Sequence, residues 1–202
     1  MAENATTERA HEIKAEVDGA LSQHVDQLAA PETLRAAMSH AVTGPAKRVR
    51  SVLVVLTGDA FGVSAPTLIR AAMSVEMVHA ASLVLDDLPA MDDATERRGA
   101  PPTHVQFGEA TAVLAAISLL NEGYRILASL EGVAPRAAAA ATYEMTEAVG
   151  VAGLTSGQWR DLNPLPDADA ATIAETHAGK TGALFGAALA IPGALAGQTE
   201  GH

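Results

Sequence analysis

The sequence predicts an all-α, single-domain helical bundle that spans residues 1–202. Hydrophobic residues make up 49% of the chain and aromatic residues only 3%, with alanine supplying much of the apolar total. Alanine is the best helix former and lets helices approach closely. Apolar residues recur at helical spacing, and no segment alternates convincingly as a half-buried strand does. The length of the chain suits one domain better than two.

Three helices are expected in the N-terminal third of the chain. From about Thr7 to Leu28, the spacing of apolar residues is that of an amphipathic helix. Pro31 is expected to open a short second helix, which precedes a turn at Gly44-Pro45. Residues 47–61 contain the run VLVVL, whose pattern fits either a strand or a helix. The length of this segment and its helical neighbours favour a helix.

A long central helix is expected to begin near Pro66. It runs through the segment RAAMSVEMVHAASLVLDD and is broken at Pro89, because proline cannot continue a helix interior. Residues 91–107 are rich in proline and polar side chains, so we expect a polar connecting segment there.

The C-terminal half is expected to hold three further helices. Alanine-rich periodic stretches predict one helix over Glu109–Leu130 and a second from Pro135 to about Leu162. A proline-containing loop follows, and Asp169 is placed to act as the N-cap of a last helix that reaches Ala190. Pro192 is expected to lie beyond the end of that helix.

Charge and composition exclude several classes of function. The formal net charge is -11 at pH 7, which argues against nucleic acid or an anionic membrane surface as the main partner. The absence of cysteine excludes disulfides, thiolate metal sites and a cysteine nucleophile, and it suits a cytoplasmic protein. The acidic N-terminus does not resemble a secretion signal. Since no long uncharged apolar run is evident, we expect no transmembrane segment.

An acidic cluster is the strongest chemical signal in the sequence. Asp86, Asp87, Asp92 and Asp93 gather at the end of the apolar central helix. Carboxylate oxygens are hard ligands, and Mg²⁺ typically takes one or two of them together with phosphate oxygens and water. A solvated helix end is the alternative interpretation. That alternative places negative charge at the negative end of the helix dipole, so it is disfavoured.

Histidine and arginine side chains flank this cluster. His79 lies two helical turns before Asp86 and shares its face, with Ser82 between them, although a lone histidine is more often structural. Arg97 and Arg98 follow the cluster and could bind two phosphate groups. Viewed alone, they are better explained as charge balance for the neighbouring acids.

Two further groups of residues are candidates for binding anions. Lys47, Arg48 and Arg50 follow the predicted turn and could hold a diphosphate near a helix N-terminus. Gln158 shares a helical face with Asp161, and Lys180-Thr181 supplies a cation and a hydroxyl group. Each group taken alone is more simply interpreted as ordinary surface.

Four stretches, in order along the chain, together resemble a known family. They are GPAKRVR at 44–50, EMVHAASLVLDDLPAMDDATERRGAPPTHVQFGEATAVLAA at 76–116, GQWRD at 157–161 and KTGALF at 180–185. An ordered set of motifs is far more specific than a single aspartate-rich run. On these residues the chain resembles the trans-isoprenyl diphosphate synthases, or polyprenyl synthetases, and most of all the bacterial geranylgeranyl diphosphate synthases of carotenoid pathways. The resemblance implies the isoprenoid synthase fold.

The resemblance also implies a role for each matching residue. Asp86 and Asp92 are similar to Mg²⁺ ligands, with Asp87 in the same motif and in the same expected ligand set. The residues similar to those that hold an allylic diphosphate are Arg97, Lys180 and Thr181, with Gln158 as a further substrate contact. The residues similar to an isopentenyl diphosphate site are Lys47, Arg50, His79 and Arg98. The expected catalytic set is Asp86, Asp87, Asp92, Arg97 and Lys180.

The chemistry implied by the resemblance is a prenyl transfer. Mg²⁺ and cationic side chains would stabilise pyrophosphate as it leaves dimethylallyl, geranyl or farnesyl diphosphate, and isopentenyl diphosphate would attack the resulting allylic cation. Small residues at Ala81 and Ser82, and the Pro89-Ala90 expansion between the aspartates, favour a geranylgeranyl over a farnesyl product. The family usually forms homodimers, and the helix over 109–130 is expected to supply the contact.

The sequence departs from the family pattern in three places. Members of the family continue past the KTG segment into a helix with a second aspartate-rich motif, and this sequence stops before it, so we expect a C-terminally truncated domain. Ser51 and Pro102 stand where the family usually has proline and threonine. Besides an active synthase, the sequence therefore allows an inactive homologue that acts as a partner or regulatory subunit of a full-length synthase. The ordered motifs argue against a third interpretation, a helical oligomerisation module.

Overall fold

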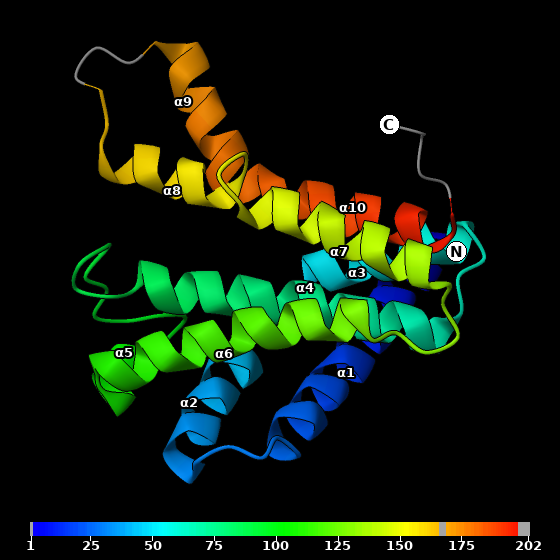
Figure 1. Ribbon diagram of the computed structural model, residues 1–202, viewed down its shortest axis with the longest axis horizontal. Coiled ribbons are helices and arrows are strands. Elements are labelled where there is room, and N and C mark those ends of the chain that lie inside the picture. The colour runs from blue at the N-terminus through cyan, green and yellow to red at the C-terminus, as the bar shows by residue number, and fades with distance from the viewer. Residues whose placement is uncertain (1, 166–168, 198–202) are drawn as a thin grey trace.

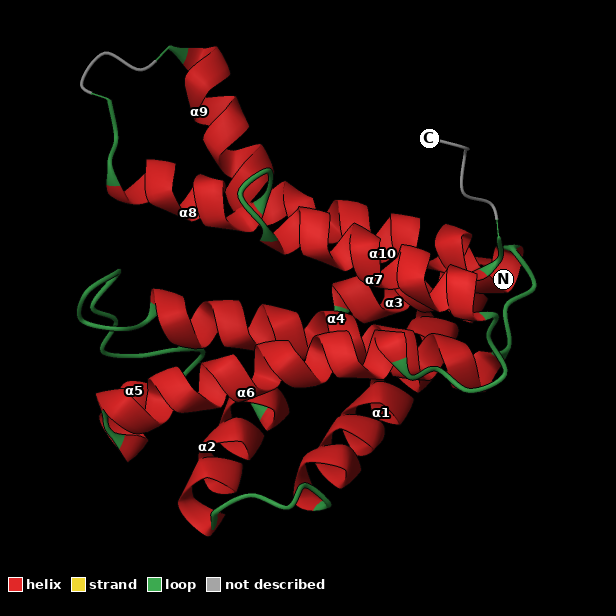
Figure 2. Ribbon diagram, in the orientation of Figure 1, coloured by secondary structure: helices red, strands yellow, loops and turns green. Residues whose placement is uncertain are grey.

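A computed structural model of the protein describes residues 2–165 and 169–197, and all regular secondary structure in these ranges is helical. Figure 2 shows the helices and the loops that join them. The prediction of an all-α fold is confirmed. The helices are α1 (Ala2–Asp26), α2 (Glu32–Thr43), α3 (Val49–Ala60), α4 (Ala65–Asp86), α5 (Thr103–Phe107), α6 (Glu109–Ala128), α7 (Pro135–Val149), α8 (Leu154–Leu162), α9 (Ala170–His177) and α10 (Ala183–Leu195), with a π-helical turn, η1 (Ala178–Gly182), between the last two.

Helix α4 lies at the centre of the bundle. It packs against α6 along its length and also contacts α1, α2, α3 and α10. In Figure 1, α1 and α2 cover one side of the α4–α6 pair, while α7 and α10 lie side by side on the other. Most residues of α4 are buried, and they face the core on all sides of the helix. A helix that is apolar all round is one that neighbours enclose.

The close approach of α4 and α6 depends on one glycine. A Cβ atom built on Gly123 would lie 2.7 Å from Cγ2 of Val78, so a larger side chain would force the helices apart. The Ser74 hydroxyl donates to the Gly123 carbonyl at 2.7 Å and supplies a polar link across the same contact. The middle of α4 is therefore packed closely against α6.

Among the residues that the structure describes, two helices are long and apolar enough to cross a membrane by length and composition alone. They are α4 and the stretch Ala174–Leu195, which joins the end of α9, η1 and α10. Within α4, 72% of the apolar window is buried inside the protein, as in the core helix of a globular domain, and 39% of the window in Ala174–Leu195 is buried. Such helices are weak evidence for a transmembrane segment.

The single helix predicted over 135–162 is wrong in the structure, which divides it into α7 and α8. The break lies at Gly150–Gly153. Gly153 has φ -124° and ψ -121°, and a Cβ atom there would lie 2.2 Å from the carbonyl oxygen of Ala148. Because only glycine fits this position, the chain can turn sharply where the surrounding residues alone would favour a continuous helix.

Three other boundaries differ from the expected ones. The segment over 91–107 is not wholly irregular, because its last five residues form α5. The first helix starts at Ala2 rather than near Thr7. The last helix continues past Pro192, whose buried ring packs in the core and offsets the hydrogen bond that proline cannot donate. The predicted cap is confirmed, since Asp169 Oδ1 accepts a hydrogen bond from the Thr172 amide at 2.8 Å.

Candidate active site

The loop after α4 folds back on the end of that helix. The Asp92 amide donates to the Asp86 carbonyl at 2.9 Å, and the Ala94 amide donates to the Asp87 carbonyl at 3.2 Å. These bonds satisfy carbonyls that the end of an α-helix leaves without partners. They also bring Asp92 back beside Asp86, so that two carboxylates separated by a proline-containing turn share one end of the bundle, here called the acidic end.

The surroundings of Asp86 disfavour its charged form. Burial, together with the nearby charges of Asp92 and Asp87, raises the pKa of Asp86 from 3.8 to about 6, although Lys180 and Arg97 act in the opposite direction. The protein itself therefore stabilises the negative charge of this carboxylate poorly. A bound cation would relieve the repulsion, which is the behaviour expected of a metal ligand.

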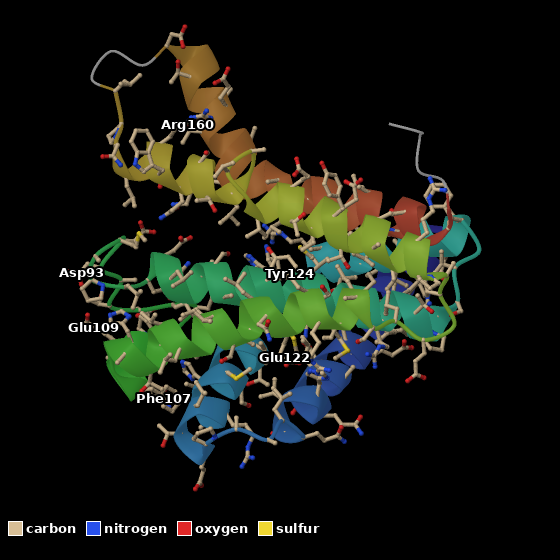
Figure 3. All side chains as sticks on the ribbon, viewed as in Figure 1. Asp93, Phe107, Glu109, Glu122, Tyr124 and Arg160 are labelled. Carbon is tan, nitrogen blue, oxygen red and sulfur yellow. The ribbon has the colours of Figure 1, made fainter. Side chains whose placement is uncertain are left out.

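Lys180 reaches the acidic end from η1, far along the chain. Its Nζ donates to the carboxylate of Asp161 on α8 and lies 3.9 Å from Oδ2 of Asp92. Burial tends to lower the pKa of Lys180, but its hydrogen bond to Asp161 and the charges of Asp92, Asp161 and Asp86 outweigh that effect, so the pKa is raised. A permanent cation therefore faces the carboxylates. Figure 3 shows the loop that bears Asp93 at the same end of the bundle as α8, where Arg160 is labelled.

The carboxylate of Asp87, which was predicted to be a metal ligand, is paired with Arg97 in the structure. Successive helical residues point about 100° apart, and the buried Asp87 carboxylate faces the returning loop, where both of its oxygens accept hydrogen bonds from Arg97, from Nε at 2.8 and 3.1 Å and from Nη2. A carboxylate saturated by a guanidinium has little capacity left for a cation. Arg97, predicted to hold a diphosphate, is thereby fixed beside the acidic end.

The remaining carboxylates fit a Mg²⁺ ion that is completed by its substrate. Within 2–165 and 169–197, no group of three or more His, Cys, Asp or Glu side chains is arranged to hold a metal. Asp86 and Asp92 supply hard oxygen ligands, and Mg²⁺ characteristically binds through one or two carboxylates plus phosphate oxygens and water. The donor set therefore suits a metal that arrives with a diphosphate rather than one held in an all-protein cage.

A second, cationic pocket lies beside α3, and we call it the basic pocket. Its volume is about 600 Å³. Four residues predicted to form the isopentenyl diphosphate site line it together: Lys47, Arg50, His79 and Arg98. Arg98 Nη1 donates to the Pro45 carbonyl at 3.0 Å, which ties the loop after α4 to the turn before α3. The Arg50 guanidinium lies 4.3 Å from the centre of the Phe185 ring and is held by a cation–π contact.

His79 is a neutral member of the basic pocket. Burial and the positive charges of Arg50 and Arg98, with smaller contributions from Arg48 and Arg97, lower its pKa from 6.5 to about 3. The uncharged imidazole can therefore donate and accept hydrogen bonds at neutral pH. The predicted stripe with Ser82 is only partly formed, because the Ser82 hydroxyl donates to the His79 carbonyl at 2.8 Å and not into the pocket.

Sequence reasoning missed the carboxylate that lines the basic pocket. Glu76 is buried in α4, and its side chain pairs with Arg48, also buried, at 3.0 Å. Two signals pointed to it: a lone charged residue inside an apolar helix is rarely buried without a partner, and Glu76 lies one turn before His79 on the same face. Nothing local could have identified Arg48 as that partner.

Gln158 and Thr181 flank the acidic end. Gln158 on α8 is only 8% exposed, and both polar atoms of its amide lack hydrogen-bond partners. A buried amide of this kind is costly unless a ligand satisfies it. Thr181 is exposed and follows Lys180 in η1. Both positions are compatible with the substrate contacts expected of them.

The raised pKa of Asp86 leads to a pH-dependent prediction for the metal-free protein. Between about pH 4 and pH 6 the folded state retains a proton that the unfolded chain has lost, so the Asp86 carboxylate makes the fold less stable as pH rises. The Asp86→Asn variant should therefore be more stable than the wild type at about pH 7.5, and this gain should shrink towards about pH 4. Urea unfolding across this range measures it. A variant that is no more stable at the higher pH would contradict the assigned burial of charge.

Comparison with known proteins places this geometry in a family. The polyprenyl synthetase family matches residues 31–202. The chain is 38% identical over 199 residues to a geranylgeranyl diphosphate synthase of Pantoea ananas, and the match covers 96% of this chain and 66% of that protein. It is 43% identical over 164 residues to the farnesyl diphosphate synthase of Escherichia coli, covering 77% of this chain and 53% of that protein.

A solved structure agrees with these matches. The geranyltransferase of Legionella pneumophila superposes with a TM-score of 0.93 at 29% identity, covering 100% of this chain and 71% of that one. The sequence thus spans between about half and two thirds of the length of the two curated relatives. Because the matched family region contains the acidic end, the basic pocket and the helices that carry them, the chain belongs to the polyprenyl synthetase family.

Proposed function

We propose that the chain forms the main part of a Mg²⁺-dependent prenyltransferase that condenses isopentenyl diphosphate with an allylic diphosphate. The observation that carries the proposal is the pairing of two different anion sites. The acidic end repels an anion unless a divalent cation accompanies it, while the basic pocket can bind one without a metal. Such a pair of anion sites suits a reaction that uses two different diphosphates and must hold each at its own site. The names of the relatives, which include farnesyl and geranylgeranyl diphosphate synthases, support this class of substrate.

In the proposed reaction the main task of the protein is to position charged groups around the two diphosphates. Asp86 and Asp92 would hold Mg²⁺, which when bound neutralises charge on the departing diphosphate. Lys180 and Arg97 lie beside that position and would bind the remaining phosphate oxygens. Lys47, Arg50 and Arg98 would hold the second diphosphate. The isopentenyl double bond then forms the new carbon–carbon bond, the allylic carbon–oxygen bond breaks, and the isopentenyl unit loses a proton.

We propose a geranylgeranyl rather than a farnesyl product. Ala81, five residues before Asp86, is fully buried, and the hydroxyl of the adjacent Ser82 donates to the His79 carbonyl. Neither side chain is large enough to block a growing apolar tail at this level of α4. We expect Ala81→Phe to fill this space and to shorten the product. An unchanged product length in that variant would contradict the proposed geranylgeranyl product.

A homodimer is part of the proposal. Helix α6 presents Leu114 and Ile117, which are 55% and 54% exposed and lie three residues apart on one face. Apolar side chains exposed together in this way are typical of an interface. Sedimentation equilibrium measures the mass directly, and a monomer at micromolar concentration would exclude the dimer.

The test of the proposed function is a product assay. The purified chain is incubated with isopentenyl diphosphate, farnesyl or geranyl diphosphate, and Mg²⁺, and prenyl products are separated by chain length. We expect product that EDTA abolishes. Absence of product from the chain alone, combined with a changed rate or product length when it is added to a full-length synthase, would instead favour the partner-subunit function. If neither result is obtained, the proposed function fails.

A further inference from the structure

The basic pocket is built around a buried ion pair that does not itself present a charge for binding. Arg48 Nη1 donates to Glu76 Oε2 at 3.0 Å, and the two side chains are 4% and 3% exposed. Arg48 is flanked by Lys47 and lies two residues before Arg50, while Glu76 lies one turn before His79. The pair thus connects the α3 wall of the pocket to its α4 wall.

Each member of the pair is also bonded to other elements. Arg48 Nε donates to Asp18 on α1 at 2.7 Å, and its Nη2 donates to the carbonyl of Val42 in α2. Glu76 Oε1 accepts from the Ser51 hydroxyl at 2.8 Å and from the Ser51 amide at 3.3 Å. Four helices therefore meet at a single guanidinium–carboxylate contact.

The backbone conformation of Arg48 is one that its surroundings must hold in place. Arg48 has φ 52° and ψ 33°, a left-handed conformation that is unfavourable for a residue with a Cβ atom. Such a conformation persists only where surrounding bonds hold it. This turn of the chain sends the Arg48 side chain into the core and leaves those of Lys47 and Arg50 at the pocket.

We propose that Glu76 is a positioning residue for the diphosphate in the basic pocket, acting through Arg48 and, in this chain, anchored by Ser51. The inference rests on the proposed anion-binding function of the pocket. Proline, the residue that the resemblance leads one to expect at position 51, would offer neither of the two donors from which Glu76 accepts.

A purely electrostatic role for Glu76 predicts the opposite result on substitution. Glu76 is the one carboxylate among the residues that line the pocket, beside four cationic side chains. Removing its charge would then strengthen the binding of an anion. A positioning role predicts weaker binding, because Arg48 loses its partner and the left-handed turn loses its support. The sign of the change therefore separates the two roles.

The experiment measures the binding of inorganic pyrophosphate by calorimetry in EDTA, so that the metal-dependent acidic end does not contribute. Glu76→Gln preserves size and Glu76→Asp preserves charge. We expect both to weaken binding by on the order of tenfold, the effect typical of removing a residue that orients a ligand-binding side chain. Ser51→Ala should act in the same direction and less strongly. It removes one donor only, so it keeps the test valid if the Glu76 variants fold poorly.

The matched control is Glu122→Gln. Glu122 is also a poorly exposed carboxylate in an ion pair, with Arg125 and His24, but it lies on α6 and outside the lining of the basic pocket. It should leave pyrophosphate affinity unchanged. Unchanged or tighter binding in Glu76→Gln, with wild-type binding present, would overturn the positioning role alone. If the wild type itself binds no pyrophosphate without metal, the proposed function of the pocket fails, and the inference fails with it.

Discussion

Replacement of Asp86 by asparagine is expected to lower Mg²⁺-dependent product formation by at least about a hundredfold, the size of effect that follows loss of one group stabilising charge in a transition state. Asparagine keeps the shape of the side chain but removes the charge that a hard cation requires. The measurement is the initial rate of prenyl product formation at fixed Mg²⁺. If the chain is active only with a partner, the quantity to measure is instead the Mg²⁺-dependent binding of pyrophosphate by the isolated chain.

The control for this variant lies in the loop that follows α4. Asp93 is exposed and has φ 47°, a conformation in which asparagine is tolerated as well as aspartate. Asp93→Asn changes charge by the same amount near the same place, so a nonspecific effect of charge would appear in both variants. We expect only Asp86→Asn to lose the metal-dependent signal. Activity retained in Asp86→Asn, with helicity intact, would refute its assignment as a metal ligand.

The substitution Gly157→Ala is expected to damage the acidic end from a distance. A Cβ atom on Gly157 would lie 2.2 Å from the backbone nitrogen of Lys180 and 2.5 Å from the carbonyl carbon of Gly179. Because backbone atoms cannot turn aside as a side chain can, α8 and η1 must separate. We expect a loss of about 1–3 kcal/mol in the free energy of unfolding. We also expect up to about a hundredfold weaker Mg²⁺-dependent binding of pyrophosphate, since a shift of roughly 1 Å in a positioned group can have that effect.

Gly186→Ala is the matched control for this second prediction. Gly186 lies in α10, and no heavy atom lies within 4 Å of the position that its Cβ would occupy. Alanine there should be neutral or stabilising by up to about 1 kcal/mol, because it is the better helix former. Thermal unfolding and calorimetry on both variants measure the difference. A Gly157→Ala protein with wild-type affinity would show that the close contact does not determine where Lys180 lies.

The helices themselves could be predicted from local patterns. Apolar spacing in α1, α4 and α6 repeats with the period of a helix, and proline and aspartate mark several of the starts. The break between α7 and α8 could not be found in this way. It depends on a backbone conformation at Gly153 that only the packed structure requires, whereas the flanking alanines favour continuation of the helix.

Prediction of the candidate site was limited by the choice of partners. Residues two turns apart on one helix, such as His79 and Asp86, could be assigned to one face from their spacing. Whether the Asp87 carboxylate would face a metal ion or the Arg97 guanidinium depended on the path of the loop after α4, which residue spacing does not determine. The same holds for Arg48 and Glu76, which are separated by 28 positions and meet only because α3 packs on α4.

The two arginines of the loop after α4 have a consequence for the geometry of the reaction. Arg97 is fastened to Asp87 on α4, while Arg98, with φ 54°, points to the Pro45 carbonyl at the turn before α3. Consecutive Cα atoms are about 3.8 Å apart across a peptide unit. In the proposed complex, a single peptide unit would therefore join a side chain that binds the allylic diphosphate to one that binds isopentenyl diphosphate, so the two anion sites could separate only as far as the reach of these two side chains allows.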